Sequence, residues 1–163
     1  MKKGNKILGI DPGLKGAIVL MDGGPKLVHW PMPHDTEGRV DWSAVHEIID
    51  GVNPDHVFLE RALAFGMGVK GAFNYGRDFK AIEIAIDLQQ CPVTFVESHK
   101  WTKALHQGIS NDLKPKVKSA MALKRLLPQL VAQVPVDKKG NFDEGVLDAA
   151  LIAYWGRKEL GLS

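Results

Sequence analysis

Three acidic side chains stand at the ends or in the middle of apolar stretches of this sequence. Asp11 follows the run "ILGI" and Glu60 follows "HVFL", so each carboxylate ends a segment typical of a buried strand. Asp148 interrupts "DEGVLDAALIAYW", in which residues 145 to 155 are otherwise apolar on nearly every helical face. A buried carboxylate costs free energy unless a polar or positive group compensates it. These three residues are therefore the first candidates for chemistry.

Two further acids precede Asp148. Glu144 lies four residues earlier, on the same helical face, whereas Asp143 could instead serve as the N-cap of that helix. Carboxylates that converge on one site repel each other, and divalent cations are the usual remedy. Carboxylate and water ligands suit Mg²⁺ or Mn²⁺ rather than zinc, and the histidines and the cysteine show no ligand spacing. We therefore expect a magnesium site.

Each acid also has a structural interpretation. Asp11 could accept backbone hydrogen bonds within its own turn, and Glu60 could pair with Arg61 or a lysine at the surface. A structural role is harder to assign to Asp148, because a helix that is apolar all round is buried.

Apolar patterning predicts the elements that would position these acids. Residues 5–12 and 16–21 are predicted to form a strand pair joined by the turn "DPGLKG", followed by strands in "KLVHWPM", "DHVFLERA" and "PVTFVE". Helices are expected over 41–52, 78–90, 113–127 and 143–159, with "FGMGVKGAFNYGR" as a glycine-rich connection before the second. In the third helix, Val117, Met121 and Leu127 form the expected core face. This order predicts an α/β fold with a five-stranded mixed sheet flanked by helices.

Length and composition suit one globular domain over residues 1–163. The chain is 45% hydrophobic and 25% charged, with a formal net charge of +2. Its single cysteine, Cys91, excludes an internal disulfide and favours a reducing compartment. Asp11 interrupts the first apolar run too early for a signal peptide, and no stretch approaches the about 20 apolar residues of a membrane helix. We expect a soluble cytoplasmic protein without membrane contact or a small-molecule cofactor.

Taken together, these stretches resemble the RuvC family of Holliday-junction resolvases, within the RNase H-like nucleases, and especially its compact phage-type members. The resemblance runs from "ILGIDPGLKGAIVLMD" through "VFLERA" and "GVKGAFNYGR" to "VTFVESHKWTKAL" and "DEGVLDAALIAYWG". It implies an RNase H-like fold and a nuclease whose metal ligands include Asp11, Glu60 and Asp148.

The fourth metal ligand is where this sequence departs from the cellular members of the family. Those members carry Asp or His three residues before the last Asp, and Gly145 occupies that position here. Phage-type members more often place the acid just before that glycine, which favours Glu144 and leaves Asp143 as the alternative.

The resemblance also implies a mechanism, a partner and an assembly. Two Mg²⁺ ions about 4 Å apart, which Mn²⁺ is expected to replace, would clamp the scissile phosphate, and Asp11 would contact both. The products are nicks with 5′ phosphates. Paired cuts on a two-fold symmetric four-way junction imply a homodimer, for which the resemblance suggests the helix after Glu60 as interface. For a phage-encoded protein the compartment would be the host-cell cytoplasm.

Lysines crowd between His99 and Lys139, where they could neutralise DNA phosphates. The resemblance singles out Lys103 in the "WxK" segment and either Lys114 or Lys116 as active-site lysines, and we take Lys103 and Lys116 as catalytic candidates. Trp101 is assigned to packing. For most of these lysines, a solvated helix face is the alternative. The predicted DNA-binding residues are Phe65 as a base wedge, and Lys70, Arg77, Lys100, Lys103, Lys114, Lys116 and Lys118.

Three other functions compete with a junction resolvase. Actin-like sugar kinases and ATPases also open with an Asp-Gly turn, but their fold needs two such lobes and 163 residues leave no room for the second. A non-catalytic DNA-binding relative conflicts with the presence of every expected carboxylate. An RNase H-like nuclease for flaps, branched DNA or RNA–DNA hybrids stays open, because the carboxylates specify the reaction and not the substrate.

Overall fold

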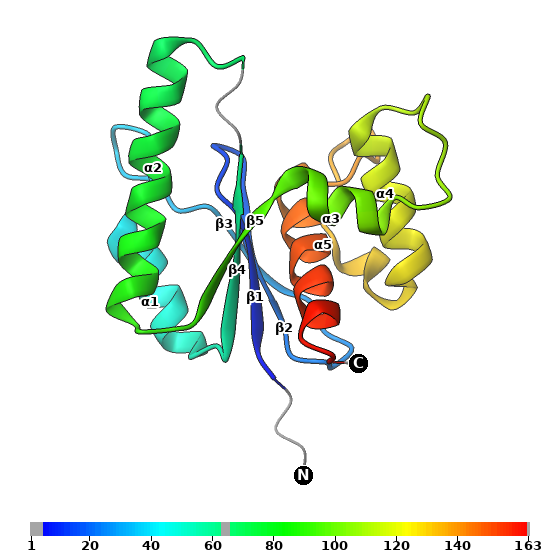
Figure 1. Ribbon diagram of the computed structural model, residues 1–163, viewed down its shortest axis with the longest axis horizontal. Helices are drawn as coiled ribbons and strands as arrows, with labels where there is room; N and C mark the ends of the chain where they lie inside the picture. Colours follow the sequence, from blue (N-terminus) through cyan, green and yellow to red (C-terminus); the bar gives the residue numbers. More distant parts are fainter. Residues whose placement is uncertain (1–4, 63–65, 163) are drawn as a thin grey trace.

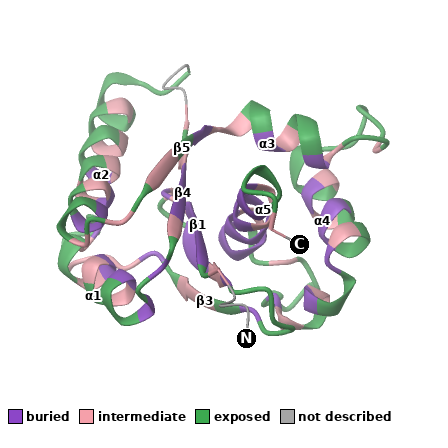
Figure 2. Cartoon of the chain, turned by 60° about the horizontal axis from the view of Figure 1, so that its bottom comes forward, coloured by how far each residue is buried: buried purple, intermediate pink, exposed green. Residues whose placement is uncertain are grey.

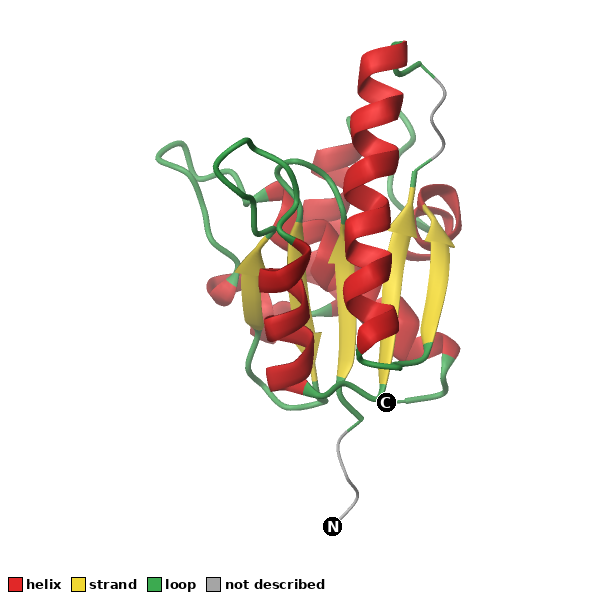
Figure 3. Cartoon of the chain, turned by 90° about the vertical axis from the view of Figure 1, so that its left-hand side faces the viewer, coloured by secondary structure: helices red, strands yellow, loops and turns green. Residues whose placement is uncertain are grey.

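A five-stranded mixed sheet forms the centre of the molecule, with the strand order β3-β2-β1-β4-β5 (Figure 3). The structure, a computed structural model, describes residues 5–62 and 66–162. β1 pairs antiparallel with β2 and parallel with β4; β2–β3 is antiparallel and β4–β5 parallel. The predicted fold class is confirmed. The strands are β1 (Ile7–Asp11), β2 (Ala17–Met21), β3 (Val28–Pro31), β4 (His56–Arg61) and β5 (Val93–Glu97).

Helices cover both faces of this sheet (Figure 1). On one face lie α1 (Trp42–Val52) and α2 (Val69–Leu88). On the other lie α3 (Ser98–Leu105), α4 (Pro115–Leu126), the 3₁₀ helix η1 (Pro128–Gln133) and α5 (Glu144–Glu159). No helix in the described part of the chain combines the length and the apolar character that crossing a bilayer requires.

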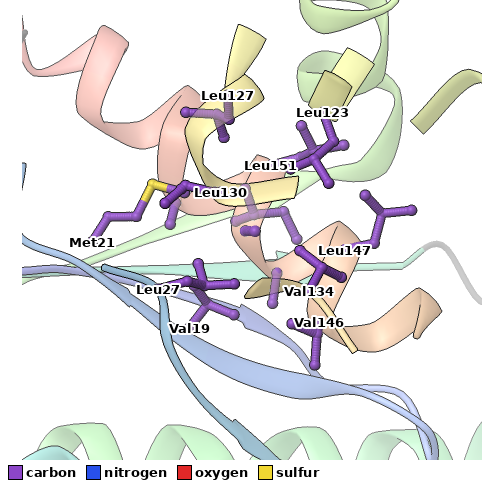
Figure 4. Close-up of a cluster of buried hydrophobic side chains, with 14 of the residues drawn as sticks. Val19, Met21, Leu27, Leu123, Leu127, Leu130, Val134, Val146, Leu147 and Leu151 are labelled. Carbon is purple, nitrogen blue, oxygen red and sulfur yellow. The ribbon is translucent and has the colours of Figure 1, made fainter. Parts of the chain in front are cut away.

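Side chains alternate along each strand and so supply two separate hydrophobic clusters. Leu8 and Leu59 pack toward α1 and α2, whereas Ile7 and Phe58 pack toward α5. Burial is concentrated in β1, in β4 and along α5, which lies between the sheet and α4 (Figure 2). Figure 4 shows the second cluster, in which side chains from β2, α4, η1 and α5 meet.

Helix α5 lies in direct contact with the backbone of β1 and of the turn after it. A Cβ atom at Gly9 would overlap the backbone of Ala149 and Ala153, and one at Gly145 would overlap the carbonyl of Lys15. Because glycine has no Cβ, the two elements can approach this closely. The first turns of α5 are thereby held against the end of β1, where Asp11 stands.

Two predictions about the helices are wrong in part. Helix α2 begins at Val69 rather than near residue 78, so part of the predicted glycine-rich connection is helical. Its glycines lower helix propensity, but the turns from 82 onward are buried on the sheet and extend the helix. On α4, Val117 and Met121 are 39% and 44% exposed. The face that packs on α5 instead carries the buried residues Ser119, Ala122 and Leu123.

Candidate active site

Asp11 and Glu60 end neighbouring parallel strands. Ile10 pairs with Leu59 in the β1–β4 register, so the two acids follow at adjacent positions of the two strands. Because side chains alternate, both acids point to the face that also carries Phe58 and α5. The structure thus brings two predicted acids together at the carboxyl ends of β1 and β4, the end of the sheet where α/β proteins place their chemistry.

Asp148 joins these acids from the second turn of α5. Burial, together with the negative charges of Asp11 and Glu60, raises the pKa of Asp148 to about 7, while the Ser119 side chain opposes the shift. The charge of Glu144 adds to it. The three carboxylates therefore lie near enough to repel one another.

Asp11 shows the same electrostatic environment from the strand side. The pKa of Asp11 is raised to about 6, chiefly by burial. The backbone N–H of Gly13 donates to its Oδ1 at 3.0 Å and opposes this rise, whereas the charges of Glu60 and Asp143 add to it. Asp11 therefore accepts the predicted hydrogen bond within its own turn, and it also lies near other acids. The structural interpretation and the candidate-site interpretation of Asp11 are both consistent with the structure.

Asp143 and Glu144 begin α5 with different local partners. Asp143 is the N-cap, and its carboxylate accepts a hydrogen bond from Val146 N at 2.9 Å. Glu144 is exposed and forms an ion pair with Lys116 of α4, with 3.4 Å between Nζ and Oε1. Since the charge of Asp143 acts on Asp11 and that of Glu144 on Asp148, both stay candidates for the fourth ligand.

Two polar residues that the sequence analysis missed support the carboxylates. Trp101, expected only to pack, is 3% exposed, and its Nε1–H donates to Glu60 Oε1 at 2.9 Å. Ser119 is buried on α4, where its side chain acts to lower the pKa of Asp148 and its Oγ lies 3.4 Å from His106 Nε2. A buried tryptophan N–H usually finds an acceptor, and this rule could have identified Trp101. Ser119 carries no comparable signal in the sequence.

Most predicted DNA-binding residues in the described part of the chain are exposed. Lys103 and the half-buried Lys118 line a hollow of about 500 Å³ next to α3, which also includes His106. Arg77 forms an ion pair with Asp78 at 2.9 Å. Phe65, the predicted base wedge, lies outside the described residues. The side chains of Lys70, Lys100 and Lys114 are exposed, and Lys116 contacts the site through Glu144.

The donor chemistry of the site fits a hard divalent cation. Every candidate ligand is a carboxylate, the donor type that Mg²⁺ and Mn²⁺ prefer. A cation would also relieve the repulsion that contributes to the raised pKa values of Asp11 and Asp148. Within residues 5–62 and 66–162, no three Asp, Glu, His or Cys side chains are close enough to form a ready-made metal cage. The acids therefore converge on one region without being pre-assembled around an ion.

Comparison with known proteins identifies the fold. No protein-family model matches the chain, and no curated protein matches it. The structure of RuvC from T. thermophilus in complex with a Holliday junction substrate superposes with a TM-score of 0.65 at 18% identity, covering 95% of this chain and 96% of that one. A second Thermus thermophilus RuvC structure gives 0.60 at 15% identity, with 96% of both chains covered.

A eukaryotic protein shares the same architecture. The yeast mitochondrial Holliday junction resolvase Ydc2 matches with a TM-score of 0.54 at 12% identity, covering 94% of this chain and 78% of that one. The chain therefore has the RuvC fold, as the sequence resemblance implied.

Proposed function

We propose that the chain is a metal-dependent, structure-selective endodeoxyribonuclease that resolves four-way DNA junctions by paired symmetric nicks leaving 5′ phosphates. The observation that carries this proposal is the convergence of Asp11, Glu60 and Asp148 at the carboxyl edge of β1 and β4, with α5 held directly on the sheet. The RuvC fold, one example of which is solved with a Holliday junction, supports the substrate class.

In this proposal the carboxylates hold two Mg²⁺ ions, with Glu144 or Asp143 as the fourth ligand. When bound, the ions would activate the attacking water and stabilise the leaving 3′ oxygen. Trp101 orients the carboxylate of Glu60, because its donor occupies one oxygen and leaves the other free. Ser119 stabilises the charged form of Asp148, since its side chain opposes the rise in the pKa of that carboxyl.

Lysines supply positive charge to the scissile phosphate in the proposed reaction. Lys116 is the better placed of the two catalytic candidates, since its ammonium already lies 3.4 Å from Glu144. It would exchange this exposed partner for a phosphate oxygen at little cost in free energy. Lys103, which lines the hollow next to α3, would contact the backbone farther along the strand.

The proposed enzyme acts as a homodimer with one nuclease domain in each chain. Val69 and Phe73 lie four residues apart on α2, 91% and 72% exposed, and thus share an uncovered apolar face. Such exposed apolar side chains support the interface that the resemblance suggested. Sedimentation equilibrium of the wild type and of Phe73→Ser tests this, and a monomeric wild type would contradict it.

A cleavage assay in Mg²⁺ tests the function. It compares a labelled four-way junction with a flap, a linear duplex and an RNA–DNA hybrid, and includes Asp11→Asn as the control. We expect symmetric nicks on the junction that the variant does not make. Preferential cutting of flaps or hybrids would contradict the junction assignment and support a different RNase H-like nuclease.

A further inference from the structure

Residues 33–41 and 135–143 are two copies of the same loop. Their sequences, "PHDTEGRVD" and "PVDKKGNFD", share the proline, both aspartates and the glycine at equivalent positions. The glycines, Gly38 and Gly140, have positive φ angles of 75° and 79°. The last aspartate of each loop caps the helix that follows, α1 in the first case and α5 in the second.

The hydrogen bonds of the two loops also match. The central aspartates, Asp35 and Asp137, each accept the backbone N–H groups of the residues two and four positions later. These distances are 2.8 and 3.0 Å in the first loop and 2.7 and 2.9 Å in the second. Each loop therefore folds on the same backbone framework, which depends on the shared residues.

The tips of the loops differ in charge. The first carries Thr36 and Glu37, and Glu37 forms an ion pair with Arg39 at 3.0 Å. The second carries Lys138 and Lys139, both exposed, for which the described residues contain no ion-pair partner. Since the first loop folds with an acidic tip, the framework does not require lysines in the second. The lysine pair is therefore a property of this tip and not of the shared framework.

The second loop, orange in Figure 1, borders a groove against α4. The groove has a volume of about 180 Å³, with Asn141 and Phe142 on the loop side and Lys116 and Lys124 on the helix side. The ammonium of Lys124 lies 5.7 Å from the centre of the Phe142 ring. Glu144 of the candidate active site also lines it, so the groove borders that site.

We propose that this groove, lined by the residues named above, binds the backbone of the DNA strand next to the cleaved phosphate, with Lys138 and Lys139 contacting phosphates. The inference rests on the proposed nuclease function. Lys116 and Lys124 line the helix side of the groove, and Lys138 and Lys139 directly precede Gly140, which lines the loop side. Cations beside a narrow groove match the negative charge along a DNA strand, and the Phe142 ring in its lining suits a sugar or a base. The first loop, with its acidic tip, would take no part.

Transferring the acidic tip to the second loop tests the proposal. Lys138→Thr/Lys139→Glu gives that loop the tip of the first, which already folds on the same framework, so we expect an unchanged melting temperature. Binding to a labelled four-way junction is measured by fluorescence anisotropy in the Asp11→Asn background, in which the DNA stays intact. We expect a Kd about tenfold higher, and a plot of log Kd against log salt concentration whose slope is smaller by about 2.

A second double variant controls for overall charge. Lys26→Glu/Lys158→Thr changes the net charge by the same amount, at the end of the sheet where β2 leads to β3 and α5 ends. We expect its Kd to stay within about twofold of the parent. Equal losses in both variants, or no loss in the loop variant, would overturn the inference. A wild type that neither binds nor cuts junctions would instead overturn the proposed function.

Discussion

The two faces of the sheet are packed by different means. Toward α1 and α2, aliphatic side chains such as Ile49 and Ile82 fill the space between helix and strand. Toward α5, the helix rests on the backbone itself, on β1 through Gly9 and on the turn after β1 through Gly145. Glycines are also present on the first face, but a Cβ at Gly51 or Gly76 would meet nothing within 4 Å.

This difference explains why the candidate site lies on the α5 face. A side-chain layer can repack when a residue changes, whereas a backbone contact fixes the helix at one distance and one register. Asp148 is thereby held beside Asp11 and Glu60, close enough for their charges to raise its pKa. The glycines of this face hold α5 and so position Asp148, whereas Gly51 and Gly76 on the other face have open space around them.

Removing a carboxylate from each face should separate chemistry from stability. For Asp148→Asn we expect cleavage to fall by at least roughly 100- to 1,000-fold, because a ligand of the proposed metal ions, which stabilise the transition state, is lost. Junction Kd should change by less than about twofold. Single-turnover rates on a junction measure the first quantity, and anisotropy the second.

The matched control is Asp78→Asn on α2. Asp78 is also buried, and it accepts a hydrogen bond from Val40 N at 3.3 Å and pairs with Arg77. This variant should lose about 1–3 kcal/mol of stability while the folded enzyme still cuts at the wild-type rate. If Asp78→Asn lost cleavage while Asp148→Asn stayed active, the catalytic site would have to lie on the α1 and α2 face of the sheet instead of the α5 face.

The charge of the α5 face should also appear in the pH dependence of stability. The pKa values of Asp11 and Asp148 are raised from 3.8 to about 6 and about 7, so the folded state holds these protons to higher pH than the unfolded chain does. Stability of the metal-free protein should therefore fall as pH rises from about 4 to about 7, by on the order of a few kcal/mol.

Urea denaturation in EDTA at a series of pH values measures this loss. Asp148→Asn should flatten the curve, and Mg²⁺ should restore stability at pH 8 in the wild type but less in the variant. A metal-free wild type that gains stability over this pH range would contradict the repulsion between the carboxylates.

Adding one methyl group to a glycine of each face compares the two kinds of packing directly. Gly9→Ala forces α5 away from β1 and should cost about 1–3 kcal/mol or more of unfolding free energy. Gly51→Ala, inside α1 and facing open space, should instead stabilise the protein by about 0.5–1 kcal/mol. Urea denaturation of both variants gives these values, and similar effects in the two would show that the faces do not differ.

The sequence predicted the sheet and the location of the acids because both depend on local patterns. Apolar runs ending in Asp11 and Glu60 mark strand ends wherever the strands pair, and Asp148 stands out in a helix with no polar face. The structure confirms these locations, whereas the role of the acids as metal ligands stays a prediction. The start of α2 was missed because its glycines argue against a helix that tertiary packing nevertheless extends.

Contacts between distant elements were beyond prediction from the sequence. On α4, Val117 and Met121 have the spacing of a core face, but the side that meets α5 was set by the position of that helix. Ser119 is an ordinary helix residue until α5 brings Asp148 to it. In the same way, Trp101 could be predicted as buried, but its partner Glu60 lies 41 residues earlier in the chain.

Trp101 and Trp155 both lie on the α5 face of the sheet, Trp101 buried and Trp155 half-buried, and they allow a smaller test of how the carboxylates are oriented. Trp101→Phe removes the donor to Glu60 Oε1 but keeps an aromatic ring, so cleavage should fall roughly 10-fold, with unchanged junction Kd. Trp155 packs edge-on against Phe58, with 5.9 Å between ring centres, and Trp155→Phe should leave the cleavage rate of the folded enzyme unchanged. Because a positioning role acts through the metal ligand, Trp101→Phe should also require a higher Mg²⁺ concentration for half-maximal stabilisation in thermal unfolding. Equal effects of the two substitutions would reduce Trp101 to a packing residue, and would leave Glu60 positioned by its strand alone.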